Sequence, residues 1–277
     1  MDDLGATAES SDPALSRQIL TALQSAHAPV AVFANCQALQ PSTLLLWQQA
    51  GATVGNHTAT HLSVDAHGAD DVWWKDVQDC HLQLQSILRQ PVRYFRYPYL
   101  RYGQDAATRA AASQRIASLG YAVAHVTAAT SEWLLAQYYE IALAKHDAPL
   151  ANELAQAYVT HLVDSLQAAQ DLAQQKTGHG VAQITLAHVN RLAADHLSDV
   201  LAALRARGWH FISLSEALSD AVYTQPDEYT GRCGCSWLAR IPPAIQHGDV
   251  YVFGDYEDQI RARFEARVTG TVGEPTK

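Results

Sequence analysis

The stretch Gly55-Asn56-His57-Thr58-Ala59-Thr60-His61 directly follows a short apolar run, residues 52–54. Its two histidines stand four positions apart, and on a helical turn this spacing places both rings on one face. A divalent metal can bind both imidazoles in that arrangement. The chain has 13 histidines, so one such pair can arise by chance. Whether this stretch is a metal site therefore depends on the other motifs in the sequence.

Short apolar runs and longer amphipathic segments alternate along the chain. We expect strands at residues 30–33, 52–54, 92–96, 121–127, 181–188 and 210–214. The expected helices cover residues 12–28, 41–51, 69–88, 105–119, 131–145, 149–176 and 193–207. This alternation predicts parallel strands joined by crossover helices. The number of strands favours a closed or partly closed barrel, and no phosphate-binding glycine motif follows a strand.

Composition excludes several classes of partner. The 277 residues suit one large domain or two small ones, and the net charge of -9 argues against nucleic acid and anionic membranes as partners. No apolar run is long enough for a transmembrane helix, and no signal-peptide pattern is visible at the N-terminus. The cysteines are scattered, and Cys233 and Cys235 stand too close for a usual zinc pair, so we expect unpaired thiols.

Three further polar clusters accompany the histidine stretch: Asp2-Asp3, Arg96-Tyr97-Pro98-Tyr99 and Leu186-Ala187-His188. In this order the four clusters resemble the motifs of polysaccharide deacetylases, carbohydrate esterase family 4. The resemblance covers roughly residues 1–220 and implies an α/β fold, a distorted and incomplete (β/α) barrel of parallel strands with outer helices. It also implies a metal-dependent hydrolase that removes acetyl groups from glycans. Residues 221–277 resemble a C-terminal extension of one bacterial branch, and we expect them to pack on the same domain.

The resemblance implies a divalent metal, expected to be zinc, bound by Asp3, His57 and His61. One carboxylate and two imidazoles leave positions open, as in catalytic rather than structural sites. A metal in such a site lowers the pKa of bound water from 15.7 towards ~7. Asp2 matches the family's general base, and Arg96 matches the arginine that orients this base through a charge-assisted hydrogen bond.

The remaining roles concern the leaving group and the substrate pocket. Tyr99 matches the residue whose backbone N–H stabilises the tetrahedral oxyanion. His188 matches the general acid that protonates the leaving amine. Trp133 and Leu186 are expected to line the pocket for the acetyl methyl group.

Two departures from the family pattern shape our expectations. Only Met1 precedes Asp2-Asp3, whereas the family motif ends a complete strand. We therefore expect either a truncated first strand or a barrel that lacks one strand, and in both cases a fraying aspartate pair and weak metal binding. Ala129 stands where the family usually has an aspartate that orients the acid histidine. We therefore expect the pKa of His188 near its ordinary ~6.5, a less fixed ring and reduced turnover.

Three functional hypotheses remain open at this point. The leading one is a deacetylase acting on N-acetylated sugars of a glycan, with an acetylated carbohydrate as its partner. The second is a catalytically impaired relative that binds carbohydrate, and the third is a hydrolase of a non-sugar amide or cyclic imide. The aromatic residues of segment 94–102 fit either a sugar-stacking surface or a core. The oligomeric state and the compartment stay open, although the resemblance implies export.

Overall fold

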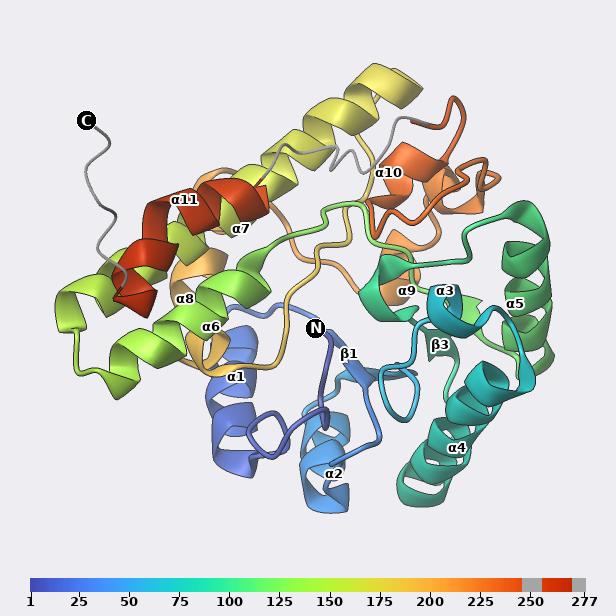
Figure 1. The fold of residues 1–277 in the computed structure, drawn as a ribbon, viewed down its shortest axis with the longest axis horizontal. Helices are drawn as coiled ribbons and strands as arrows, with labels where there is room; N and C mark the ends of the chain where they lie inside the picture. The colour runs from blue at the N-terminus through green and yellow to red at the C-terminus, as the bar shows by residue number, and fades with distance from the viewer. Residues whose placement is uncertain (246–255, 271–277) are drawn as a thin grey trace.

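The computed structural model describes residues 1–245 and 256–270, and Figure 1 shows their arrangement. A four-stranded parallel sheet has the order β1-β2-β3-β4. Its strands are β1 (Ala31–Ala34), β2 (Thr53–Asn56), β3 (Tyr94–Phe95) and β4 (Ala122–Val123). Each strand pairs with the next one along the chain, so the intervening helices lie outside the sheet, as the alternation of the sequence predicts.

Helices surround the strands and supply most of the core. They are α1 (Pro13–Ser25), α2 (Pro41–Gln49), α3 (Val64–His67), α4 (Asp71–Leu88), α5 (Ala106–Ser118), α6 (Glu132–Ala144), α7 (Ala148–Thr177), α8 (Arg191–Ala206), α9 (Leu214–Ala217), α10 (Trp237–Arg240) and α11 (Tyr256–Thr269), with short 3-10 turns at Pro98–Leu100 and Ala221–Thr224. Aspartate side chains cap the N-termini of several helices: Asp12, Asp70 and Asp105 each accept a hydrogen bond from a backbone N–H of the first turn. No helix in the described ranges is both long and apolar enough to cross a membrane.

The N-terminal residues close the ring of strands. Figure 1 marks the N-terminus at the centre of the molecule, beside β1. Isolated parallel bridges join Asp2 to His188 and Leu4 to Ala34. The Asp2 N–H donates to the Ala187 carbonyl at 2.8 Å, and the Asp2 carbonyl accepts from Val189 at 3.0 Å. The first residues thus lie between β1 and segment 184–189, and the expected distorted barrel is confirmed.

Two strand predictions are wrong in detail. Segment 181–188 pairs only at isolated bridges, Ala128 with Thr185 and Asp2 with His188. Segment 210–214 contains no strand, and α9 begins at its last residue. The expected fraying of the N-terminus is also wrong, because Asp2 is only 2% exposed and is hydrogen-bonded on its backbone. Asp2 and Leu4 form isolated bridges, and their neighbours on both sides hold them in place.

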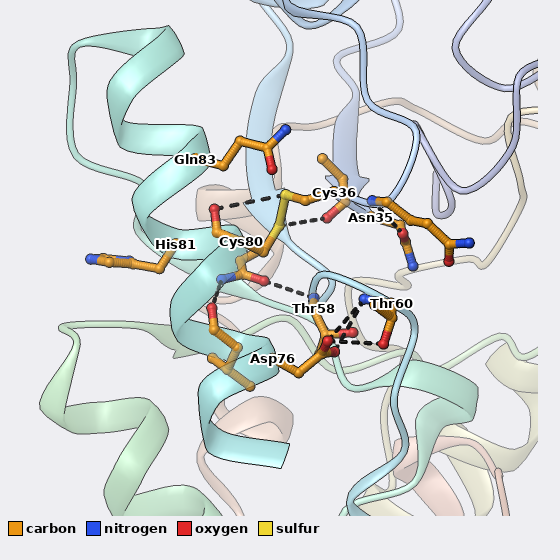
Figure 2. The surroundings of a disulfide bond; sticks show 12 residues. Asn35, Cys36, Thr58, Thr60, Asp76, Cys80, His81 and Gln83 are labelled. Carbon is orange, nitrogen blue, oxygen red and sulfur yellow. Dashed lines mark hydrogen bonds between the residues drawn. A yellow bond between two sulfur atoms is a disulfide. The ribbon is translucent and has the colours of Figure 1, made fainter. Parts of the chain in front are cut away.

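The expectation of unpaired thiols is wrong for all four cysteines. Cys36 pairs with Cys80 and Cys233 pairs with Cys235. Figure 2 shows the first disulfide, which joins the loop after β1 to the middle of α4. The two residues are 44 positions apart in the sequence, yet their Cα atoms lie 5.4 Å apart. Sequence spacing alone gives no sign of this proximity, because the packing of α4 creates it.

The described part of the proposed C-terminal extension contacts the segment that follows β4. The Trp237 N–H donates to the Val126 carbonyl at 2.6 Å, and the Ser236 hydroxyl donates to the Thr127 carbonyl at 2.5 Å. The Trp237 ring stacks on His125, with ring centroids 3.7 Å apart. Residues 246–255 and 271–277 of the proposed extension lie outside the described ranges.

Candidate active site

The histidine stretch forms a loop at the carboxyl end of β2 and not the helical turn that its spacing predicts. The Thr58 N–H donates to the Asn56 side-chain oxygen at 2.7 Å, which turns the chain sharply after the strand. Thr58 and His61 both adopt a left-handed backbone, with φ of 68° and 59°. These two bends bring the rings of His57 and His61 together, as a helical turn would also have done.

Helix α4 holds this loop from behind through one buried carboxylate. Asp76 accepts hydrogen bonds from the Thr60 N–H at 3.1 Å and from the Thr60 hydroxyl at 2.9 Å. The Asp76 carbonyl also accepts from the Ala59 N–H at 3.1 Å. Figure 2 shows the contacts between Thr60 and Asp76 next to the Cys36–Cys80 disulfide. The disulfide and Asp76 therefore fix the same helix against the loop that carries both histidines.

Asp3, His57 and His61 present their ligand atoms to a common point. The Asp3 Oδ1 atom lies 3.6 Å from His57 Nε2 and 3.4 Å from His61 Nε2, and the two Nε2 atoms are 3.2 Å apart. Ligands about 2.1 Å from a tetrahedral metal are about 3.4 Å from one another. The side-chain arrangement thus fits a divalent metal, and the structure brings these three predicted residues together.

The protonation of the histidines agrees with metal binding. His57 Nδ1 lies 2.8 Å from the Arg96 carbonyl, to which it donates, so Nε2 keeps its lone pair for a metal. Burial lowers the pKa of both His57 and His61 to about 4, so both rings are neutral at pH 7. Within the described part of the chain, buried Asp3 Oδ1 has no hydrogen-bond partner. A cation would satisfy this oxygen.

Asp2 and Arg96 form a buried ion pair beside the metal ligands. Arg96 Nη1 lies 3.3 Å from Asp2 Oδ1, and both side chains are almost fully buried. Burial by itself raises the pKa of Asp2, but interactions led by the positive charge of Arg96 outweigh burial and lower the pKa below its usual value. The Asp2 carboxylate therefore stays ionised and is held in one orientation, as the motif comparison predicts for the general base.

His188 is held by Glu132, which corrects the expectation of a loosely fixed ring. Glu132 Oε1 accepts from His188 Nδ1 at 2.6 Å and from the His188 backbone N–H at 2.8 Å. Burial lowers the pKa of His188, but the hydrogen bond and the charge of Glu132 outweigh burial and raise the pKa to about 9. The ring is therefore protonated at pH 7, and Ala129 leaves it neither free nor at its ordinary pKa.

A pocket of about 640 Å³ connects these groups. Its lining includes Asp2, Asp3, His57, His61, Tyr99, Trp133, Leu186 and His188. Tyr99 is 56% exposed, and its ring centroid lies 4.3 Å from that of His61. Phe95, Tyr97 and Tyr102 are buried instead, so most of the aromatic cluster belongs to the core and Tyr99 alone stands at the site.

The sequence interpretation missed two supporting residues. Glu132 supplies the carboxylate that we expected at position 129, and its place directly before Trp133 at a helix start is a visible signal. Asn190 donates from Nδ2 to Glu132 Oε2 at 3.2 Å and also caps α8. No local pattern marks Asn190 as part of the site, because its role depends on a residue 58 positions away.

Together, the fold and the site define a distorted (β/α) barrel with a candidate divalent-metal centre at the carboxyl ends of its strands. Residues 2–123 match the family model described as "Polysaccharide deacetylase". The resemblance seen in the sequence is thus confirmed, and the family model covers this part of the chain. No curated protein matches the chain.

Solved structures share the fold at low sequence identity. A mutant of a Bacillus anthracis family 4 pseudoenzyme with restored activity has a TM-score of 0.53 and 18% identity, over 79% of this chain and 65% of that one. A family 4 carbohydrate esterase from Streptomyces lividans has a TM-score of 0.52 and 18% identity, over 78% and 92%. Peptidoglycan deacetylase PdaC from Bacillus subtilis has a TM-score of 0.50 and 18% identity, over 75% and 85%. The chain thus spans less than two thirds of the pseudoenzyme's length.

Proposed function

We propose that this protein is a metal-dependent hydrolase that removes acetyl groups from N-acetylated sugars of a glycan. One observation carries the proposal. The Asp3–His57–His61 group, the Asp2–Arg96 pair and the Glu132–His188 pair converge on the same site. Amide hydrolysis needs an activated water, a base and an acid, and these three groups supply one each.

Asp3, His57 and His61 would hold the cation, for which zinc fits the mixed carboxylate and imidazole donors. A cation there would polarise the amide carbonyl and acidify a water molecule. The protein contributes neutral imidazoles, because burial lowers the pKa of both histidines, and a carboxylate oxygen with no competing hydrogen bond among the described residues.

Asp2 would act as the base and His188 as the acid. The pKa of Asp2 is lowered, so its carboxylate is free to accept a proton from the attacking water. The pKa of His188 is raised to about 9, so its ring has a proton to donate to the leaving amine. Environments that push two pKa values apart in this way are typical of acid–base pairs in hydrolases.

The pocket wall would position the substrate. The Tyr99 backbone has φ of 57°, which turns the chain next to His61, and we assign its N–H to the developing oxyanion. The exposed Tyr99 ring offers a face on which a sugar can stack. Trp133 and Leu186 line the pocket and would receive the acetyl methyl group.

The disulfides favour a protein that works in an oxidising compartment. Disulfides persist in secreted and periplasmic proteins and are rare in the cytosol. The Cys36–Cys80 bond is buried next to the metal loop, so we propose export from the cytoplasm.

The Glu132–His188 pair weakens the hypothesis of a catalytically impaired relative, because Glu132 supplies the acid histidine with the carboxylate that Ala129 lacks.

The test is acetate release from N-acetylglucosamine oligomers by the zinc-loaded protein. We expect turnover that chelation abolishes and that Asp2→Asn and His188→Ala each reduce by about 100-fold or more. A panel of non-sugar acetamides and cyclic imides is run in parallel. Turnover of the panel compounds but not of the sugar oligomers would show that the substrate is a non-sugar amide or imide. Metal binding without any turnover would contradict the hydrolase assignment.

A further inference from the structure

The turn that carries Tyr99, Pro98–Leu100, has an unusual backbone. Tyr99 and Leu100 both lie in the left-handed region, with φ of 57° and 50°. Residues other than glycine rarely adopt this conformation, and they keep it only where the surrounding structure holds them. No hydrogen bond among the described residues occupies the Tyr99 N–H, the group that we assign to the oxyanion. The turn therefore needs support from another segment that leaves this N–H unoccupied.

Residues 231–237 of the C-terminal region are attached on both sides of this turn. At the start of the segment, the Gly231 N–H donates to the Gln104 carbonyl at 2.8 Å, in the loop that follows the turn. At its end, the buried Ser236 hydroxyl donates to the Thr127 carbonyl at 2.5 Å, in the segment after β4. The two attachments fix the position of the residues between them.

The middle of this segment contacts Tyr99 directly. Cys233 and Cys235 form a disulfide, which closes residues 233–235 into a tight turn. Gly234 lies against the Tyr99 carbonyl, and a Cβ atom at position 234 would overlap that oxygen. The overlap is with main chain, so no side-chain rotation can relieve it. Glycine is required here by the close approach of two backbones and not by a left-handed φ.

The contact is part of the pocket wall. Gly234 and Cys235 line the same cavity of about 640 Å³ as Tyr99 and the metal ligands. On the deacetylase function proposed above, we propose that Gly234 is a positioning residue, which holds Tyr99 so that its N–H meets the oxyanion. A preorganised donor stabilises the charge that develops in the transition state and contributes little to substrate binding. Displacing Tyr99 should therefore lower kcat and leave KM nearly unchanged.

The test replaces Gly234 by alanine and measures kcat and KM for acetate release by the zinc-loaded protein. We expect Gly234→Ala to lower kcat by about tenfold or more, with little change in KM or in zinc affinity. Gly180→Ala is the matched control, because an added Cβ atom there meets the end of the flexible Gln170 side chain and no main chain. The control should leave kcat unchanged.

Two further measurements do not depend on the overlap or on turnover. The Cys233→Ser/Cys235→Ser variant opens the turn without adding a group beside Tyr99, and it should also lower kcat while zinc affinity is kept. In protein labelled at the tyrosine nitrogens, the Tyr99 amide resonance is assigned with Tyr99→Phe. This resonance should shift in Gly234→Ala and in the double variant, but not in Gly180→Ala.

Several results would overturn the proposal. Equal kcat in Gly234→Ala and the wild type would do so, as would an unmoved Tyr99 amide resonance. A higher KM at unchanged kcat would show that Gly234 only shapes the pocket, and a parallel loss of zinc affinity would place the effect at the metal site. A wild type that binds zinc but releases no acetate would contradict the deacetylase function instead. The Tyr99 resonance alone would then decide whether Gly234 positions this turn.

Discussion

Glu132 Oε1 lies 2.6 Å from His188 Nδ1 and 2.8 Å from the backbone nitrogen of the same residue. One carboxylate oxygen thus fixes both the ring and the main chain of the candidate acid. Glu132 is itself fully buried, at the first position of α6, and Asn190 donates to its other oxygen. Two hydrogen-bonded neighbours at defined positions leave the His188 ring little freedom to turn.

The first prediction is that Glu132→Gln moves the alkaline limb of the pH–rate profile. His188 donates its proton only while protonated, and Glu132 is what raises its pKa to about 9. Replacing the carboxylate by an amide removes that charge, so kcat/KM should fall at a pH lower by about one unit or more. The measurement is kcat/KM for acetate release between pH 6 and 10. Glu216→Gln, at an exposed position in α9, is the control and should leave the limb unchanged.

The same contact predicts how stability depends on pH. The pKa of His188 is raised in the folded protein from 6.5 to about 9, so the folded state holds the proton more tightly than the unfolded chain. The stabilisation is complete below pH 6.5 and is lost as the pH rises towards 9. The urea midpoint of the wild type should therefore fall across this interval more steeply than that of Glu132→Gln. Parallel curves for the two proteins would contradict the assignment.

Much of the site was visible in the sequence because its ligands lie in compact motifs. His57 and His61 are separated by only three residues, and Arg96 belongs to the compact motif Arg96-Tyr97-Pro98-Tyr99, so both motifs can be recognised from local spacing. The helical turn inferred from that spacing was wrong, because left-handed residues at Thr58 and His61 bring the rings together in a loop. A side-chain cluster can thus be predicted correctly while its backbone is not.

The incorrect predictions depend on contacts between residues that are far apart in the sequence. Glu132 reaches His188 across 56 residues of chain, and this contact needs α6 to begin beside segment 184–189. The strand predicted at 210–214 has the apolar pattern of a strand but no partner within the described residues, so it remains irregular. Apolar pattern predicts which residues are buried, whereas pairing depends on neighbours that the pattern does not identify.

Removing the Asp3 carboxylate should weaken metal binding while leaving the fold intact. Asp3→Asn keeps the shape of the side chain but loses the charge, and its Oδ1 atom has no hydrogen bond to lose among the described residues. We expect zinc affinity to fall by about 10-fold or more, and His57→Ala to abolish binding. Equilibrium dialysis measures both, with His179→Gln as an exposed control. Unchanged affinity in Asp3→Asn would exclude Asp3 from the metal site.

The buried Asp2–Arg96 pair should be strongly coupled. Removing one partner leaves the other charge buried and unpaired, which costs about 3–5 kcal/mol. Arg96→Met and Asp2→Asn should therefore each lower the free energy of unfolding. The double variant should be less destabilised than the sum of the two, because neither charge then remains unpaired. Urea unfolding of the four proteins gives the coupling free energy directly, and strict additivity would show that the pair does not interact.

The Cys36–Cys80 disulfide should stabilise both the fold and the metal loop. It links residues 44 positions apart, and closing a loop of that length contributes up to about 4 kcal/mol through the entropy of the unfolded chain. The Cys36→Ser/Cys80→Ser variant should lose a large part of this stability in urea unfolding. It should also bind zinc more weakly, because α4 carries Asp76, which anchors Thr60 between the two histidines.

The second disulfide of the same chain provides the matched control. Cys233 and Cys235 are two positions apart, so their bond closes a far smaller loop and removes much less entropy from the unfolded chain. The Cys233→Ser/Cys235→Ser variant should therefore lose less stability and keep its zinc affinity, since this disulfide does not attach α4, the helix that anchors the histidine loop. Equal losses of zinc affinity in the two double variants would show that the metal loop does not depend on the attachment of α4.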